Sequence, residues 1–330
     1  MEFVTGVQTE LIRFRDIASG SLDGRSASVK GAVHALRELG GVNFITLRLR
    51  DGALQCVCAP EALPEGLCEE CTVCVTGVFR REDRAPGGHE LAAESVRVLS
   101  RPAEAMPVPV SKRRLNLNLD TELGLRPVAL RNLRLRSVFK VQEGISRAFR
   151  EYLTREGFTE VHTPKIVHAG AEGGSNIFRL DYFGRKAFLA QSPQFYKQTM
   201  VGVFERVFEV APVFRAEKHS TPRHLNEYTS LDFEMGYLDG FEDIMRVETG
   251  FLQYAMKLLN TEYADELKRL DVKLPRVDQI PAVRFDEAKR LAAEKYGRPI
   301  RDPYDLEPEE EHNIGRYFQE EYGADFVFVT

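Results

Sequence analysis

Two short segments carry the side chains best suited to chemistry. The first, residues 214–234, places Arg215, Glu217 and Arg223 in a polar stretch between two apolar runs. A guanidinium group is the natural bidentate partner of phosphate oxygens, and a neighbouring carboxylate can accept a hydrogen bond from an exocyclic amine. The pattern therefore fits a nucleotide site, although a solvated charged loop between strands would have the same composition.

The second segment, residues 191–198, mixes amide, hydroxyl and ammonium groups with two aromatic rings. Its Ser192, Gln194 and Lys197 could form a pocket for a small carboxylate, because a lysine buried among amides would attract one. The alternative is the first turn of an ordinary amphipathic helix that begins after Ser192 and Pro193.

Glycine loops that cradle phosphates are absent from the sequence. It contains neither Gly-x4-Gly-Lys-Ser/Thr nor a Gly-x-Gly-x-x-Gly that follows a strand-like run. A bound nucleotide would therefore be held by side chains.

The five cysteines are crowded between Cys56 and Cys74. Cys68-x2-Cys71-x2-Cys74 has the spacing of zinc ligands, but no second pair of Cys or His follows at the usual distance. We therefore expect structural thiols. The N-terminus lacks the basic and apolar stretches of a secretory signal, and the odd number of cysteines fits a reduced, cytoplasmic protein.

The elements that must position these groups change type along the chain. The first hundred residues contain five short runs rich in β-branched and other apolar residues, separated by turn signals. These runs are 28–34, 44–49, 54–58, 72–79 and 91–98. Asp51-Gly52 is a hairpin signal between the second and third runs. Five short strands in about 100 residues predict a small barrel of the oligonucleotide-binding (OB) type.

Residues 101–109 hold three prolines and show no period, which indicates a linker. Beyond it, helical spacing and strand-like runs predict a mixture of helices and strands. The predicted elements are a helix at 137–156, an extended segment at 158–166, strands at 207–214 and 231–238, and helices at 241–259 and 286–296. The fold class is therefore α+β.

The length of 330 residues and the 43% hydrophobic content are enough for two domains with separate cores. We place them at 1–102 and 122–330, joined by a linker at 103–121. No apolar run reaches the roughly 18 residues that span a membrane. The net charge of −5 argues against a general polyanion binder. Residues 111–150, however, carry ten Lys or Arg against three Asp or Glu, and could meet a nucleic-acid backbone.

Taken together, three segments resemble a known family. Phe214-Arg215-Ala216-Glu217 with Arg223-His224-Leu225-Asn226-Glu227 resembles motif 2 of class II aminoacyl-tRNA synthetases, and Gly157-Phe158-x4-Thr163-Pro164 after a long helix resembles motif 1. The run from Gln191 to Gln198 is similar to that of aspartyl-tRNA synthetases of the archaeal and eukaryotic kind. The resemblance implies an OB-fold anticodon-binding domain followed by an antiparallel class II sheet with flanking helices, here incomplete.

The family implies a role for each candidate residue. Arg215 would hold the α-phosphate of ATP and the substrate carboxylate, Glu217 the adenine amine, and Arg223 the γ-phosphate. L-Aspartate would be bound by residues of the second segment and by two further acidic residues. These are Ser192, Gln194, Lys197, Asp232 for the α-ammonium group, and Glu172 in a glycine-containing lid. Mg²⁺ would bridge the phosphates of ATP.

In the barrel, the resemblance assigns Arg37, Phe44 and Gln55 to the tRNA anticodon. An aromatic ring can stack on an unpaired base, and amide and guanidinium groups can read base edges. Discriminating enzymes of the archaeal kind carry a tryptophan and a lysine where this sequence has His34 and Pro86. The pair resembles the non-discriminating form, which implies charging of both tRNA(Asp) and tRNA(Asn). Motif 1 further implies a homodimer.

Two departures from the family matter. Gly31-Ala32-Val33 replaces the usual Gly-Trp-Val, and the chain ends at Thr330 before a motif 3 or its acidic Mg²⁺ ligands. We therefore expect a C-terminally truncated synthetase with no metal ligand in this chain, and it could be inactive alone. The alternatives are an asparaginyl or lysyl relative and a non-catalytic protein that binds tRNA or single strands.

Overall fold

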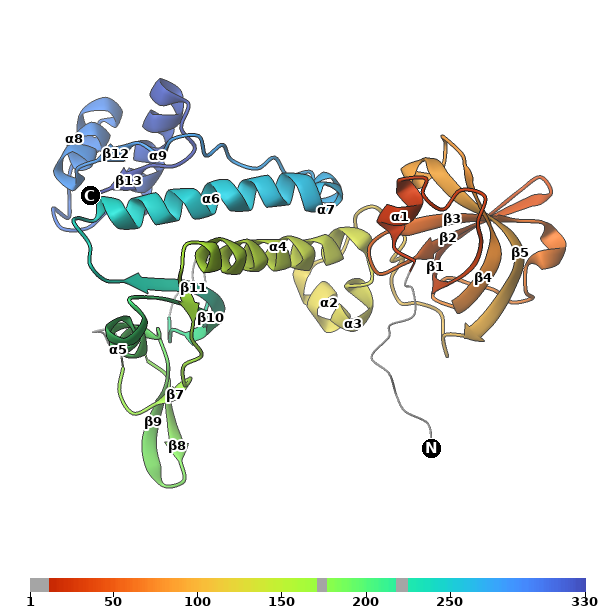
Figure 1. Ribbon diagram of the computed structural model, residues 1–330, viewed down its shortest axis with the longest axis horizontal. Helices are drawn as coiled ribbons and strands as arrows, with labels where there is room; N and C mark the ends of the chain where they lie inside the picture. Colours follow the sequence, from red (N-terminus) through yellow and green to blue (C-terminus); the bar gives the residue numbers. More distant parts are fainter. Residues whose placement is uncertain (1–11, 171–176, 218–224) are drawn as a thin grey trace. The chain divides into compact units, whose positions relative to one another are not determined.

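The computed structural model describes residues 12–170, 177–217 and 225–330. The chain divides into two compact units, residues 1–136 and 137–330, and each is described by itself (Figure 1). In the described part of the chain, no helix is both long enough and apolar enough to cross a membrane.

The first unit is built around a closed barrel. Within its described residues, the barrel has the strands β1 (Ser26–Leu39), β2 (Val42–Arg48), β3 (Ala53–Cys58), β4 (Thr72–Arg81) and β5 (His89–Ser100). Their order is β1-β2-β3-β5-β4, and every neighbouring pair is antiparallel except β3 and β5. This arrangement confirms the predicted OB-fold barrel, although β1 and β5 are longer than the sequence indicated.

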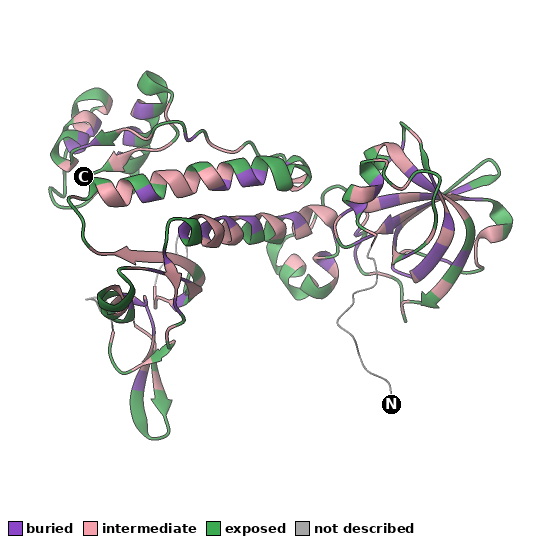
Figure 2. Cartoon of the chain, viewed as in Figure 1, coloured by how far each residue is buried: buried purple, intermediate pink, exposed green. Residues whose placement is uncertain are grey.

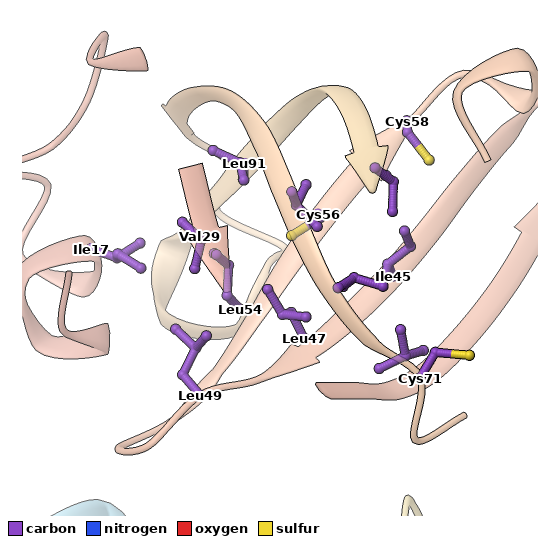
Figure 3. Close-up of a cluster of buried hydrophobic side chains, with 14 of the residues drawn as sticks. Ile17, Val29, Ile45, Leu47, Leu49, Leu54, Cys56, Cys58, Cys71 and Leu91 are labelled. Atoms are coloured by element: carbon purple, nitrogen blue, oxygen red, sulfur yellow. The ribbon is translucent and has the colours of Figure 1, made fainter. Parts of the chain in front are cut away.

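Alternating side chains fill the barrel. Ile45, Leu47, Leu54 and Cys56 are completely buried, and the residues between them are more exposed (Figures 2 and 3). This period of two is what one buried face of a strand requires. A short helix, α1 (Phe14–Ala18), packs against the same core.

The predicted hairpin between β2 and β3 also holds α1. The Asp51 carboxylate accepts a hydrogen bond from the Phe14 backbone N–H, at 3.0 Å to Oδ2. A Cβ on Gly52 would lie 2.3 Å from the Phe14 ring, so only glycine fits beneath it. The Asp51-Gly52 pair thus serves the packing of α1 as well as the turn.

The segment after β5 folds onto the first unit. It contains α2 (Leu119–Gly124) and α3 (Arg126–Ala129), and the barrel loops contain the 3₁₀ turns η1 (Pro60–Ala62) and η2 (Pro86–Gly88). The Asn132 side chain donates to the carbonyls of Val110 and Lys112, at 2.9 and 2.6 Å. The break between compact units falls after Arg136, whereas the domain limits at 102 and 122 stay predictions.

The second unit centres on a sheet with strand order β11-β10-β6. Its strands are β6 (Thr159–Glu160), β10 (Arg206–Phe214) and β11 (Glu227–Met235), and its long helices are α4 (Leu133–Arg155) and α6 (Glu242–Glu262). Phe149 and Leu153 of α4 and Val247 of α6 are buried together with Phe208 of β10. The helices therefore cover one face of the sheet.

Helices α4 and α6 lie side by side because small residues allow close approach (Figure 1). Ala148 and Ala255 are buried in the cluster between them. A Cβ on Gly144 would lie 2.7 Å from the Leu259 side chain, so glycine is required at that contact.

The remaining elements surround this sheet in sequence order. They are β7 (Ile166–Val167), β8 (Arg179–Tyr182), β9 (Arg185–Leu189), α5 (Gln194–Phe204), α7 (Ala264–Leu270), β12 (Ala282–Val283), α8 (Phe285–Tyr296), α9 (Pro308–Tyr322) and β13 (Phe328–Val329). The sequence predicted α4, α6 and α8 within a few residues but not α5, α9 or the β8–β9 hairpin. The last strand pairs in parallel with β12.

Candidate amino-acid and nucleic-acid sites

Strand β11 separates an apolar face from a polar one. Leu231, Phe233 and Met235 pack toward the core that α4 and α6 cover. Residues with the other parity are Ser230, Asp232 and Glu234, and alternation places them on the opposite face of the sheet. The alternation therefore gathers two carboxylates and a hydroxyl on the side away from the helices.

Lys197 of α5 meets this polar face. Only 4% of the residue is exposed, and its Nζ lies 2.7 Å from Asp232 Oδ1 and 3.4 Å from Glu234 Oε2. The Ser230 hydroxyl donates to the other Asp232 oxygen at 2.5 Å or accepts from it if that oxygen is protonated. A buried ammonium group with two carboxylates is a strong local electrostatic feature.

The start of α5 brings two further predicted residues to the same place. The Gln194 backbone N–H donates to Ser192 Oγ at 3.0 Å, across Pro193 at the helix start. Ser192 also lines a hollow of about 190 Å³ together with Phe195 and Tyr196. The structure therefore brings Ser192, Gln194 and Lys197 together on one helix turn and connects Lys197 with Asp232.

The predicted nucleotide residues follow β10. The Arg215 backbone N–H donates to the Asn226 carbonyl at 3.0 Å, which extends the β10–β11 pairing by one step. The Glu217 N–H then donates to the Arg215 carbonyl at 2.8 Å. Both residues thus stand at the end of the strand pair that carries Asp232, whereas Arg223 and Glu172 lie outside the described residues.

Sequence reasoning missed one buried carboxylate beside this site. Glu209 of β10 is 2% exposed, and in the strand register it stands opposite Asp232. Its oxygens accept hydrogen bonds from the Thr163 N–H at 2.7 Å, from the Thr163 hydroxyl at 2.8 Å and from Lys165 Nζ at 2.8 Å. Glu209 therefore ties the segment around Pro164 to the sheet. A lone acidic residue inside an apolar run was the available signal.

A second hollow lies on the barrel. It measures about 560 Å³ and is lined by Arg37 of β1, Phe44 of β2 and Gln55 of β3, the three predicted anticodon residues. The register places Phe44 directly opposite Arg37. An aromatic ring, an amide and a guanidinium group on adjacent strands form a surface suited to unpaired bases.

Two residues of this hollow were not predicted. Glu90, 2% exposed, accepts from Gln55 Nε2 at 2.8 Å and from Arg80 Nε at 2.8 Å. The carboxylate fixes the amide of Gln55 with its oxygen free of this particular bond, so the orientation of the amide is set from behind. This ordering is what a group that reads base edges requires.

His34 and Pro86 are not among the residues that line the hollow. His34 is 6% exposed and lies where the β1–β2 register shifts. Burial, and then the charge of Arg48, lower its pKa from 6.5 to about 4, so the ring is neutral at pH 7. Pro86 is exposed at the start of η2. The proposed role of this pair in choosing tRNA stays a prediction.

Among the described residues, no group of three or more His, Cys, Asp or Glu is arranged to hold a metal ion. All five cysteines are free thiols, and four of them are buried. The zinc interpretation of the cysteine spacing therefore has no support in the described part of the chain.

Comparisons with known proteins agree with both sites. Residues 118–330 match the family described as tRNA synthetases class II (D, K and N), and residues 27–99 match the OB-fold nucleic acid binding domain. The aspartate–tRNA(Asp/Asn) ligase of Deinococcus radiodurans is 48% identical over 309 residues, covering 93% of this chain and 70% of that protein. The ligase of the same name from Thermus thermophilus is 45% identical over 308 residues, covering 93% and 72%.

A solved structure supports the same relationship. The asparaginyl-tRNA synthetase from Pyrococcus horikoshii, complexed with asparaginyl-adenylate, matches with a TM-score of 0.81 at 29% identity, over 94% of this chain and 71% of that one. The family match covers more than half of the chain, and the relatives exceed 40% identity over most of it. The chain therefore belongs to the class II tRNA synthetases of the aspartate, lysine and asparagine group, with an N-terminal OB-fold domain.

Proposed function

We propose that the protein attaches L-aspartate to tRNA(Asp) and tRNA(Asn) through an aspartyl-adenylate, with ATP and Mg²⁺. The observation that carries the choice of amino acid is the buried contact of Lys197 with Asp232 and Glu234. The names of the Deinococcus and Thermus relatives support the same choice.

Aspartate can replace this internal pairing without leaving a charge unmatched. Its α-ammonium group would pair with Asp232, and its side-chain carboxylate would pair with Lys197, so one ion pair is exchanged for two. Asparagine would leave the buried Lys197 without a new anion, and lysine would place a second cation beside it. Breaking a buried pair without replacing the partner costs about 3–5 kcal/mol, which favours aspartate strongly.

The residues at the end of β10 would hold ATP. Arg215 would contact the α-phosphate, Glu217 would accept from the adenine amine, and Arg223 would contact the γ-phosphate. Mg²⁺ would arrive with ATP and neutralise its phosphates. The aspartate carboxylate attacks the α-phosphorus, pyrophosphate leaves, and the 3′-terminal adenosine of tRNA then takes the aspartyl group. Positioning and charge neutralisation supply most of the rate.

The barrel hollow would bind the anticodon. Phe44 would stack on one unpaired base, while Arg37 and Gln55 would contact base edges. We further propose that charging extends to tRNA(Asn), on the pattern of His34 and Pro86 and on the names of the two relatives. Glu172 would close over the amino acid, the protein would act as a homodimer in the cytoplasm, and the segment around Pro164 would contribute to the dimer contact.

The direct test is amino-acid-dependent exchange of pyrophosphate into ATP by the full-length protein, with aspartate, asparagine and lysine compared at equal concentrations. We expect exchange with aspartate alone. Exchange with asparagine or lysine at a comparable rate would assign the protein to one of those relatives. Binding of tRNA without exchange by any of the three would support the non-catalytic alternative.

A further inference from the structure

A tight turn in the barrel brings two cysteines together. Cys68 and Cys71 stand at the ends of a four-residue turn that is closed by a hydrogen bond from the Cys71 N–H to the Cys68 carbonyl at 3.2 Å. Glu70, the third residue, has φ = 66°, as in a type II turn. Turns of this kind keep the outer Cα atoms within about 7 Å, which is the range that a disulfide bridges. The two sulfur atoms lie 3.5 Å apart.

The two thiols differ in exposure, and this difference gives them different parts in an exchange reaction. Cys68 is exposed, whereas Cys71 is completely buried in the barrel core (Figure 3). The other three cysteines are buried, and burial raises the pKa of Cys56 far above its usual value. A reagent in solution therefore reaches Cys68 first, and Cys71 is the nearest thiol that can displace it.

The residues between the two cysteines hold the segment that follows the barrel. Glu69 accepts from the Ser111 hydroxyl at 3.0 Å, and Glu70, whose side chain is 2% exposed, accepts from Arg131 Nη1 at 2.9 Å. The turn itself is pinned to β1, because the Glu70 N–H donates to the Val33 carbonyl at 2.7 Å. The turn thus connects β1 with residues 111–131, the part of the chain that leads toward α4.

We propose that Cys68 and Cys71 form a reversible dithiol–disulfide site for low-molecular-weight disulfides, and that the disulfide locks the turn that holds residues 111–131. The inference does not depend on the proposed amino-acid specificity. It assigns a chemical property to the cysteine spacing that neither zinc binding nor tRNA binding explains.

The reaction balances with one small disulfide as the oxidant. The Cys68 thiolate attacks one sulfur of the reagent, which forms a mixed disulfide and releases one thiolate. The Cys71 thiolate then attacks Cys68 Sγ, forms the internal disulfide and releases the second thiolate. The two protons lost by the cysteines are taken up by the two released thiolates, and two electrons pass from the protein to the reagent.

The surroundings of Cys68 also set the pace of this exchange. Burial, followed by the hydrogen bond with Cys71, raises the pKa of the Cys68 thiol. Because the thiolate is the attacking form, the first step accelerates as the pH rises toward that pKa. Slow formation at neutral pH and faster formation at alkaline pH are therefore expected.

The test treats the 330-residue chain with oxidised glutathione, blocks remaining thiols with N-ethylmaleimide and maps the peptides by mass spectrometry. We expect a Cys68–Cys71 disulfide, about 2 Da lighter than the dithiol, that reduced glutathione reverses. In Cys71→Ser, Cys68 should retain a stable glutathione adduct. In Cys68→Ser, Cys71 should remain unmodified, and Cys74→Ser should form the disulfide as the original chain does.

Hydrogen–deuterium exchange measures the second part of the proposal. Amides of residues 111–131 should exchange at least about threefold more slowly in the oxidised chain than in the reduced chain. A stable glutathione adduct on Cys68 of the original chain would overturn the site, as would a disulfide to Cys74 or Cys58. Unchanged exchange in residues 111–131 after quantitative oxidation would overturn the lock.

Discussion

The barrel hollow and the Lys197 cluster handle polar side chains in different ways. In the hollow, Phe44 and Gln55 come from adjacent strands of one closed sheet, and Glu90 holds the Gln55 amide from behind. In the cluster, Lys197 comes from a helix and its carboxylate partners from a strand. The hollow presents an ordered surface to a ligand, whereas the cluster satisfies its own charges until a ligand replaces them.

The difference has an energetic reason. A ring and an amide on a half-buried surface can wait for a base at little cost, because water solvates what the protein does not. A buried ammonium group cannot wait unpaired, because desolvation without a partner is expensive. The charged site therefore needs Asp232 and Glu234 for stability before it needs them for recognition.

The largest expected effect comes from removing the charge at the cluster. Lys197→Met should weaken binding of a non-hydrolysable aspartyl-adenylate analogue by about 10²–10⁴-fold, because the substrate carboxylate would lose its buried cation. Isothermal titration calorimetry measures the change. Lys257→Met, at an exposed position of α6, is the matched control and should bind as the original chain does. Equal binding by both variants would remove Lys197 from the pocket.

A pH titration asks whether the barrel, like the cluster, contains a charge-sensitive buried group. His34 faces the charges of Arg48, Glu70 and Arg136, and its pKa in the folded chain is about 4 instead of 6.5. Between these values the unfolded chain binds a proton that the folded chain does not. The free energy of unfolding should therefore fall as the pH drops from 6.5 to 4, by up to about 3 kcal/mol.

Urea unfolding at a series of pH values, compared with His34→Gln, isolates this contribution because the other groups are common to both chains. The difference between the two chains should change across pH 4–6.5 and stay constant above pH 7. A constant difference over the whole range would show that His34 titrates normally in the folded barrel.

A smaller effect is expected from the ring in the hollow. Phe44→Ala should weaken tRNA binding by about 1–3 kcal/mol, roughly 5–150-fold, through the loss of base stacking. Filter binding at fixed salt concentration measures it, since salt alone changes such affinities. Tyr304→Ala removes a ring that is 90% exposed in the second unit and serves as the control. A loss of the same size in both variants would argue against stacking in the hollow.

The sequence predicted the barrel better than the cluster, and the reason is physical. Ile45, Leu47 and Leu54 alternate with more exposed residues, so a period of two is visible in the letters alone. Strand β11 begins at Glu227, four residues before the predicted start, because a polar run reads as a loop until its partner strand is known. Tertiary pairing, which no local pattern contains, settled that boundary.

Candidate residues show the same limit. Family resemblance identified Lys197 and Asp232 separately, but their contact joins residues 35 positions apart and depends on how α5 packs on the sheet. Glu209 escaped because its partners, Thr163 and Lys165, lie more than 40 residues away. Buried polar networks form between elements, so their members become recognisable only when the elements are in place.

The two sites can be tested together in one charging experiment with the full-length protein. Purified tRNA(Asp) and tRNA(Asn) are each offered aspartate or asparagine, and kcat/KM is measured for the four combinations. The cluster predicts aspartate on the tRNA and no asparagine, and the barrel predicts that both tRNAs are accepted. Attachment of asparagine, or a kcat/KM for aspartate on tRNA(Asn) more than about 1000-fold below that on tRNA(Asp), a difference of about 4 kcal/mol, would contradict the account.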